Sequence, residues 1–243
     1  MIAPIGVDDC VVLPDAEILA QRGAAWLLNR TLAAPPGPFA LCLSGGSTPR
    51  RLYELLAGAP YRDCFPWSRA HWFWGDERFV AADDKASNYR MARETLFDRA
   101  PVPPENIHPV PTQAKTPADA AADYARALQR FYGASTLSPE KPLFQATLLG
   151  LGPDGHTASL FPGSAALDEM RAWTAAVEAE AGFPRITLTY PAIDSSAAIA
   201  FLVSGAEKRD ALARLRRGES LPAARVKPLG SLTWLLDRAA AAT

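Results

Sequence analysis

Residues 39–57 read FALCLSGGSTPRRLYELLA, in which an uncharged apolar run is followed by a glycine-rich turn and a predicted helix. A continuous apolar run such as Phe39–Leu43 is typical of a strand that is buried on both faces of a parallel sheet. Similar runs occur at 71–74, 146–151, 186–189 and 198–203, and helices are predicted at 15–33, 49–57, 88–97, 117–132 and 207–217. This alternation predicts an α/β fold, namely a doubly wound, mostly parallel sheet with helices on both faces in a Rossmann-like arrangement.

The composition of the chain narrows the range of partners. Of its 243 residues, 49% are hydrophobic and 21% are charged, which is typical of a globular protein. Lys and Arg total 25 and Asp and Glu total 26, so the net charge is −1. That balance argues against a nucleic-acid partner and against binding to an anionic membrane, and it leaves room for a small anionic ligand. The proline-rich segments 35–38 and 101–111 are short connections, so we expect one domain over residues 1–243.

The cysteine count and the chain start indicate where the protein works. The three cysteines, Cys10, Cys42 and Cys64, are widely spaced and form no CxxC pair or zinc-ligand pattern, so we expect a reducing compartment and no metal site. The first residues lack the basic region of a secretory signal, and Pro, Gly and Ser interrupt the uncharged stretches. We therefore expect a cytoplasmic protein without a transmembrane helix. Because no heptad pattern or apolar surface stripe is visible, we also expect a monomer.

The first polar motif, SGGSTP at 44–49, follows the Phe39–Leu43 strand, and ligands of such sheets bind at the carboxyl ends of strands. We expect Ser47 or Thr48 to cap the following helix with Pro49 at its first position. The free N–H groups at that helix start would then form an anion site, although a simple capped turn would have the same sequence. No Gly-Lys-Ser/Thr or G-x-G-x-x-G pattern is present, which argues against a nucleotide.

The second and third motifs also follow predicted strands. WGDER at 74–78 places two carboxylates beside Arg78, either as part of a site or as an internal ion pair between Arg78 and Asp76 or Glu77. Its downstream neighbour, Ser87–Tyr89, is predicted to cap the helix at 88–97.

The third motif, GLGPDGHTAS at 150–159, contains His156. A histidine titrates near neutral pH, so this residue type suits proton transfer.

The remaining histidines and two cations have structural interpretations as well as functional ones. We expect His71 to be structural and His108 to be exposed in a proline-rich loop. Arg185 begins one predicted strand and Lys208 follows another, so both can reach the same rim, although most such residues are simply solvated.

Taken in order, these motifs resemble the 6-phosphogluconolactonase family, which is similar in fold to glucosamine-6-phosphate deaminases and isomerases. The matching segments cover nearly the whole chain: SGGSTP (44–49), WGDER (74–78), SNY (87–89), GLGPDGHTASLFPGS (150–164), RITLT (185–189), SG..K (204–208) and LPA…V (221–226).

The resemblance implies hydrolysis of 6-phospho-D-glucono-1,5-lactone in the pentose phosphate pathway, with no organic cofactor and no obligatory metal. It makes His156 the general base, and we expect Asp154 or Asp76 to orient its imidazole. It places the phosphate near Arg185, Lys208 and a loop formed by Ser44, Gly45, Gly46, Ser47 and Thr48, with Asp76 and Arg78 on the pocket rim. For the proposed chemistry, we expect the oxyanion donors to be either Arg78 or N–H groups of the glycine-rich loops.

Two other functions remain open from the sequence. One is an aldose–ketose isomerase or deaminase acting on an amino-sugar phosphate, which would use a similar base and phosphate cradle. The other is a non-catalytic sugar-phosphate sensor. WGDER and HTASLFPG favour the lactonase over the deaminase, and no residues are left over for the DNA-binding domain that such sensors carry.

Overall fold

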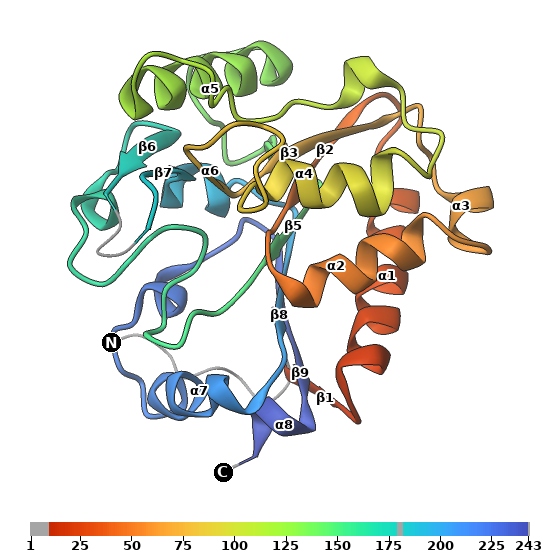
Figure 1. Ribbon diagram of the computed structural model, residues 1–243, viewed down its shortest axis with the longest axis vertical. Helices are drawn as coiled ribbons and strands as arrows, with labels where there is room; N and C mark the ends of the chain where they lie inside the picture. Colours follow the sequence, from red (N-terminus) through yellow and green to blue (C-terminus); the bar gives the residue numbers. More distant parts are fainter. Residues whose placement is uncertain (1–9, 179–181, 243) are drawn as a thin grey trace.

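A six-stranded parallel sheet forms the centre of the computed structural model, which describes residues 10–178 and 182–242 (Figure 1). Its spatial order is β1-β9-β8-β5-β2-β3, and every neighbouring pair is parallel. The prediction of a doubly wound, mostly parallel sheet is therefore confirmed. The strands are β1 (Cys10–Leu13), β2 (Phe39–Leu43), β3 (Ala70–Trp74), β5 (Ala146–Leu149), β8 (Ala198–Val203) and β9 (Ser231–Asp237).

The order of the strands places a switch point between β2 and β5. From β2 the chain moves outward to β3, and it then returns across β2 to form β5 on the other side. The connections that leave the carboxyl ends of β2 and β5 therefore diverge to opposite sides. In open α/β sheets a ligand crevice forms where the connections diverge in this way.

Helices cover both faces of this sheet. Figure 1 shows α1 and α2 on one side and α5, α6 and α7 on the other. Contacts of α1 with β8, β9 and α2 bury the first of these faces. The helices are α1 (Ala16–Leu32), α2 (Ser47–Leu56), α3 (Tyr61–Cys64), α4 (Asn88–Ala92), α5 (Pro117–Tyr132), α6 (Tyr190–Asp194), α7 (Arg209–Arg216) and α8 (Arg238–Ala241). Within residues 10–178 and 182–242, no helix has the length and apolarity that a membrane span requires.

Helix starts follow the sequence signals closely in three cases. The side chain of Asp15 accepts a hydrogen bond from the Ile18 N–H and caps α1, and Thr116 caps α5 ahead of Pro117. Ser87 caps α4 as predicted. The helix predicted over 88–97 is helical throughout, but its second half, Arg93–Phe97, is a π-helical turn. The helix predicted over 207–217 begins as a short 3₁₀ helix, Ala206–Lys208, before α7.

A second, antiparallel sheet was not predicted. It has the order β4-β7-β6, with β4 at Asp76–Arg78, β7 at Arg185–Leu188 and β6 at Thr174–Val177. The run at 186–189 was expected to join the main sheet, and this expectation is wrong. β4 carries only charged residues and therefore gives no apolar signal, and tertiary pairing with β7 makes it a strand.

His108 is half-buried, so the prediction that it is exposed is wrong. Its Nε2 lies 2.9 Å from Nδ1 of His71, and its ring stacks on Phe73 with a centroid distance of 4.5 Å. Burial, together with His71 and Arg130, lowers the pKa of His108 to about 4. Both histidines therefore belong to an aromatic cluster away from the polar loops.

The buried hydroxyl of Tyr124 ties α5 to the end of β3. It accepts a hydrogen bond from the Trp74 N–H at 2.7 Å and donates one to the Trp74 carbonyl at 2.9 Å. These two bonds fix the backbone immediately before Gly75 and Asp76.

Replacing Tyr124 by Phe removes both bonds and leaves a buried N–H and a buried carbonyl of Trp74 unpaired. We expect Tyr124→Phe to lower the free energy of unfolding by about 1–3 kcal/mol, measured by chemical denaturation. Tyr61→Phe is the matched control, because the Tyr61 hydroxyl lies 3.5 Å from its acceptor at the surface. Equal stability of the two variants would contradict the proposed tie.

Candidate active site

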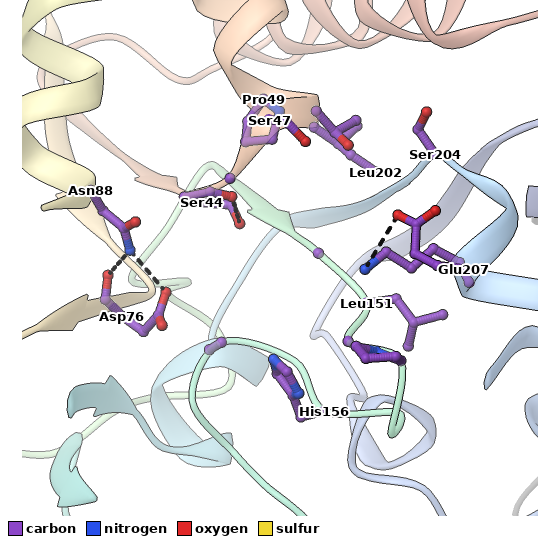
Figure 2. A pocket seen from close by; sticks show the side chains of 18 of the residues that line it. Ser44, Ser47, Pro49, Asp76, Asn88, Leu151, His156, Leu202, Ser204 and Glu207 are labelled. Atoms are coloured by element: carbon purple, nitrogen blue, oxygen red, sulfur yellow. Dashed lines mark hydrogen bonds and ion pairs between the residues drawn. The ribbon is translucent and has the colours of Figure 1, made fainter. Parts of the chain in front are cut away.

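A cavity of about 360 Å³ opens at the carboxyl ends of β2, β5 and β8 (Figure 2). Ten of the residues predicted for the site line it: Ser44, Gly45, Gly46, Ser47, Thr48, Asp76, Arg78, His156, Arg185 and Lys208. Figure 2 shows Asp76 and Asn88 on one side of the cavity, Leu151 and Glu207 on the other, and His156 between them. Asp154 is the exception, since it lies behind His156 and lines a neighbouring cavity.

The glycine-rich loop after β2 presents the start of α2 to this cavity. The predicted cap is wrong, because Gly46 is the N-cap residue and neither Ser47 nor Thr48 makes a capping hydrogen bond. Ser47 and Thr48 are instead the first two helical residues, and Pro49 is the third. Since N–H groups of a first helical turn have no acceptor within the helix, those of Ser47 and Thr48 are available to an anion.

Tyr53 holds this loop from within α2. The Ser44 N–H donates to the Tyr53 hydroxyl at 3.0 Å, and that hydroxyl donates to the Ser44 carbonyl at 2.8 Å. The same buried side chain therefore fixes both backbone groups of the residue that opens the loop.

Asn88, which was not predicted as a site residue, connects the first motif to the second. Its Nδ2 donates to the Asp76 carbonyl at 2.9 Å and lies 3.4 Å from Oδ1 of Asp76. A Cβ on Gly45 would collide with the Asn88 amide, so the glycine allows this close approach. The only signal in the sequence was the SNY motif, which was interpreted as a helix cap.

Alternation along β4 separates the three charged residues of the second motif. Asp76 and Arg78 face the cavity, whereas Glu77 points the other way and is only 2% exposed. The Glu77 carboxylate accepts hydrogen bonds from the N–H groups of Arg78, Asn88 and Tyr89, each at 2.8 Å, and from the Ser87 hydroxyl at 3.1 Å. Burial raises the pKa of Glu77, and the three N–H donors oppose that rise.

Arg78 and Arg185 face each other across the antiparallel ladder. They are register partners of β4 and β7, and burial followed by the charge of Arg78 lowers the pKa of Arg185. The ion pair of Arg78 with Asp76 or Glu77, one of the two alternatives for this motif, is not formed, and Arg78 donates to the Ala86 carbonyl at 2.6 Å instead. Among the described residues, neither guanidinium pairs with a carboxylate within 4.0 Å. Two like charges held together in this way favour an anionic ligand.

His156 is fixed by Asp154 and not by Asp76. The imidazole Nδ1 lies 2.5 Å from Oδ1 of Asp154, and the His156 N–H donates to the same oxygen at 3.1 Å. Burial pushes the pKa of Asp154 upward, but the hydrogen bonds and charge of His156 bring it below its usual range. When the imidazole is neutral, an ionised Asp154 favours the tautomer with the proton on Nδ1, which leaves the lone pair of Nε2 free. Asp76 instead accepts from the Ser159 hydroxyl at 2.6 Å.

Lys208 reaches the cavity through the turn after β8. The buried carboxylate of Asp237 organises this turn, because it accepts from the Ser204 hydroxyl at 2.5 Å and from the Gly205 N–H at 3.2 Å. Neither Asp237 nor β9, the strand that it ends, was predicted from the sequence. Across the described part of the chain, no three His, Cys, Asp or Glu side chains gather as a metal site.

Comparison with known proteins gives the relatives of this chain. Residues 14–234 match the family described as glucosamine-6-phosphate isomerases/6-phosphogluconolactonase. A 6-phosphogluconolactonase from Nostoc sp. is 43% identical over 237 residues, which cover 95% of this chain and 96% of that protein. The solved structure of the devB protein is 34% identical, covers 96% of this chain and 98% of its own, and has a TM-score of 0.86. That of the Trypanosoma cruzi 6-phosphogluconolactonase is 28% identical, covers 99% and 96%, and has a TM-score of 0.83.

The doubly wound sheet and the polar cavity at its carboxyl edge define a class of enzymes that act on sugar phosphates. The chain belongs to the glucosamine-6-phosphate isomerase/6-phosphogluconolactonase family.

Glu77 provides a direct test of how the second motif is built. A Gln at this position has one acceptor oxygen, so its amide N–H₂ would face a backbone or hydroxyl donor of the 87–89 turn. We expect Glu77→Gln to lower the free energy of unfolding by about 1–3 kcal/mol in chemical denaturation. The exposed Glu140→Gln should leave stability unchanged. A fully stable Glu77→Gln protein would contradict the role of the carboxylate as a multiple acceptor.

Proposed function

We propose that this protein hydrolyses 6-phospho-D-glucono-1,5-lactone to 6-phospho-D-gluconate, with His156 as the general base. One observation supports this reaction above the others. His156, which pairs with Asp154, lines a cavity that also contains a free helix N-terminus, Lys208 and two arginines. A base, an anion cradle and additional cations in one cavity suit acyl transfer from a phosphorylated lactone to water.

In the proposed reaction, Nε2 of His156 takes a proton from a water molecule while the water oxygen bonds to C1. The carbonyl oxygen becomes an oxyanion, which either Arg78 or the N–H groups of the glycine-rich loops stabilise. The bond between C1 and the ring oxygen then breaks, and the ring oxygen receives the proton from the imidazolium. Asp154 stabilises that imidazolium because it carries its negative charge beside Nδ1.

The phosphate is proposed to lie between the start of α2 and the cations Lys208 and Arg185. Its binding is remote from C1 and orients the reacting carbonyl toward His156. Asp76 faces the same cavity and is fixed by Ser159 and Asn88, which suits an acceptor for a sugar hydroxyl.

We further propose that the protein acts as a monomer on a free sugar phosphate in the cytoplasm. The net charge of −1 supports a small-molecule partner over a nucleic acid, and the unpaired cysteines support a reducing compartment.

The general-base role predicts the behaviour of two variants. We expect His156→Ala to lower kcat by about 10²- to 10⁴-fold, because proton transfer from water is lost while phosphate binding remains. Asp154→Asn should lower kcat by a smaller factor, since the imidazole remains but its charged partner is gone. Both rates are measured as acid release from freshly generated 6-phosphogluconolactone above the spontaneous rate.

The same proteins separate the competing functions. Release of ammonia from glucosamine 6-phosphate without lactonase turnover would assign the chain to the deaminase branch. Binding of 6-phosphogluconate with neither activity would identify a sensor. Unchanged lactonase turnover in His156→Ala would overturn the general-base assignment.

The phosphate cradle predicts strong discrimination against a substrate without phosphate. D-glucono-1,5-lactone lacks the group held by α2, Lys208 and Arg185, so its kcat/KM should be at least about 100-fold lower than that of the phosphorylated lactone. Comparable kcat/KM values for the two lactones would show that the phosphate supplies no orientation.

A further inference from the structure

A carboxylate lies beside the cation that is proposed to bind the phosphate. Glu207 lines the same cavity as Lys208, and its Oε1 is 3.9 Å from the Lys208 Nζ (Figure 2). No other carboxylate in the described part of the chain lies within 4.0 Å of Lys208. A negative charge at this position disfavours the anion that the other lining groups attract.

The turn after β8 directs Glu207 into this position. The backbone of Gly205 has a φ of +102°, and a Cβ on it would collide with the carboxylate of Glu207. The Glu207 carboxylate therefore folds back over Gly205. The Gly205 N–H donates to the Asp237 carboxylate, and this bond holds the backbone of the turn. Glycine permits both the conformation and the close approach. Glu207 is thus placed by the same buried network that places Lys208.

The solvent exposure of Glu207 and Lys208 indicates whether their contact affects folding or ligand binding. The Glu207 side chain is 64% exposed and that of Lys208 is 22% exposed. At 3.9 Å and with this exposure, the pair adds little to the stability of the fold. A phosphate dianion that approaches Lys208 has to displace Glu207 or share the cation with it. The contact therefore acts on ligand binding much more than on folding.

We propose that Glu207 is an internal competitor for Lys208 that lowers the affinity of this site for phosphate groups. This inference rests on the proposed function, in which Lys208 binds the phosphate of substrate and product. In the empty cavity Lys208 pairs with Glu207, and in the occupied cavity it pairs with the phosphate. The residue therefore sets how long the product and inorganic phosphate occupy the site.

In the proposed reaction, weaker binding of the phosphate favours release of the product. The phosphate is the same in the lactone and in the ring-opened acid, so its binding energy stabilises substrate and product alike. Affinity shared in this way does not accelerate the chemical step, and it slows product departure. Hydrolysis also adds a carboxylate to the product, which gives it a second group for the arginines to retain. A carboxylate placed beside Lys208 opposes that retention.

The test is the Glu207→Gln variant of the full chain, studied at low ionic strength because salt screens the effect. We expect the Kd values of inorganic phosphate and 6-phosphogluconate, measured by calorimetry, to fall by about 2- to 5-fold. The KM for the lactone should fall in parallel. The matched control is Glu219→Gln, which removes the same charge from a carboxylate that pairs with Arg214 and Arg217 outside the cavity. Tighter binding is a result that structural damage would not produce.

A double substitution separates competition for Lys208 from general repulsion. In a Lys208→Met background, Glu207→Gln should change the Kd for phosphate by much less than it does in the wild-type chain. An equal gain in both backgrounds would overturn competition through Lys208. A higher KM in Glu207→Gln would overturn it too, because Glu207 would then be contacting the substrate, and an unchanged Kd would do the same. Phosphate binding is measurable even if the wild-type chain lacks lactonase turnover, so failure of the proposed function is distinguishable from failure of this inference.

Discussion

The buried carboxylate of Glu77 is the constraint on which the arrangement of the site depends. A carboxylate removed from water is costly unless each oxygen finds donors, and in this protein the donors are backbone N–H groups and one hydroxyl and not a cation. Meeting that requirement brings the start of α4 onto β4. Asn88 then lies between Asp76 and Gly45, which joins the first two motifs. Arg78, freed from Glu77, remains available to the cavity.

Four of the six strands of the main sheet, β2, β3, β5 and β8, were predictable because they carry strong local signals, whereas β1 and β9 were not predicted. Phe39–Leu43 is continuously apolar, and the observed β2 has the same bounds as the prediction. The 117–132 helix was also placed correctly, since Thr116, Pro117 and Gly133 mark its two ends. By contrast, β4 consists of Asp, Glu and Arg, and only its pairing with β7, more than a hundred residues later, makes it a strand. Local sequence contains no information on such pairing.

The same distinction applies to the site. Residues in the loops that follow apolar strands, such as Ser44 and His156, could be placed at the cavity from sequence, because parallel strands end at a common edge. The choice between Asp154 and Asp76 as the partner of His156 depended on loop geometry that no spacing rule supplies. The opposition of Arg78 and Arg185 depended on strand register. Helix capping by Ser47 or Thr48 was wrong because Gly46 already occupies the capping position.

The two hydrogen bonds between Tyr53 and Ser44 have a consequence for how a ligand is received. They join the loop to the helix that it precedes, so the two form one rigid piece before anything binds. The N–H groups at the start of α2 are therefore already oriented, so an anion bound there would cost little conformational entropy of the backbone. Binding at this end of the cavity therefore replaces water by a ligand at backbone groups whose positions are already fixed.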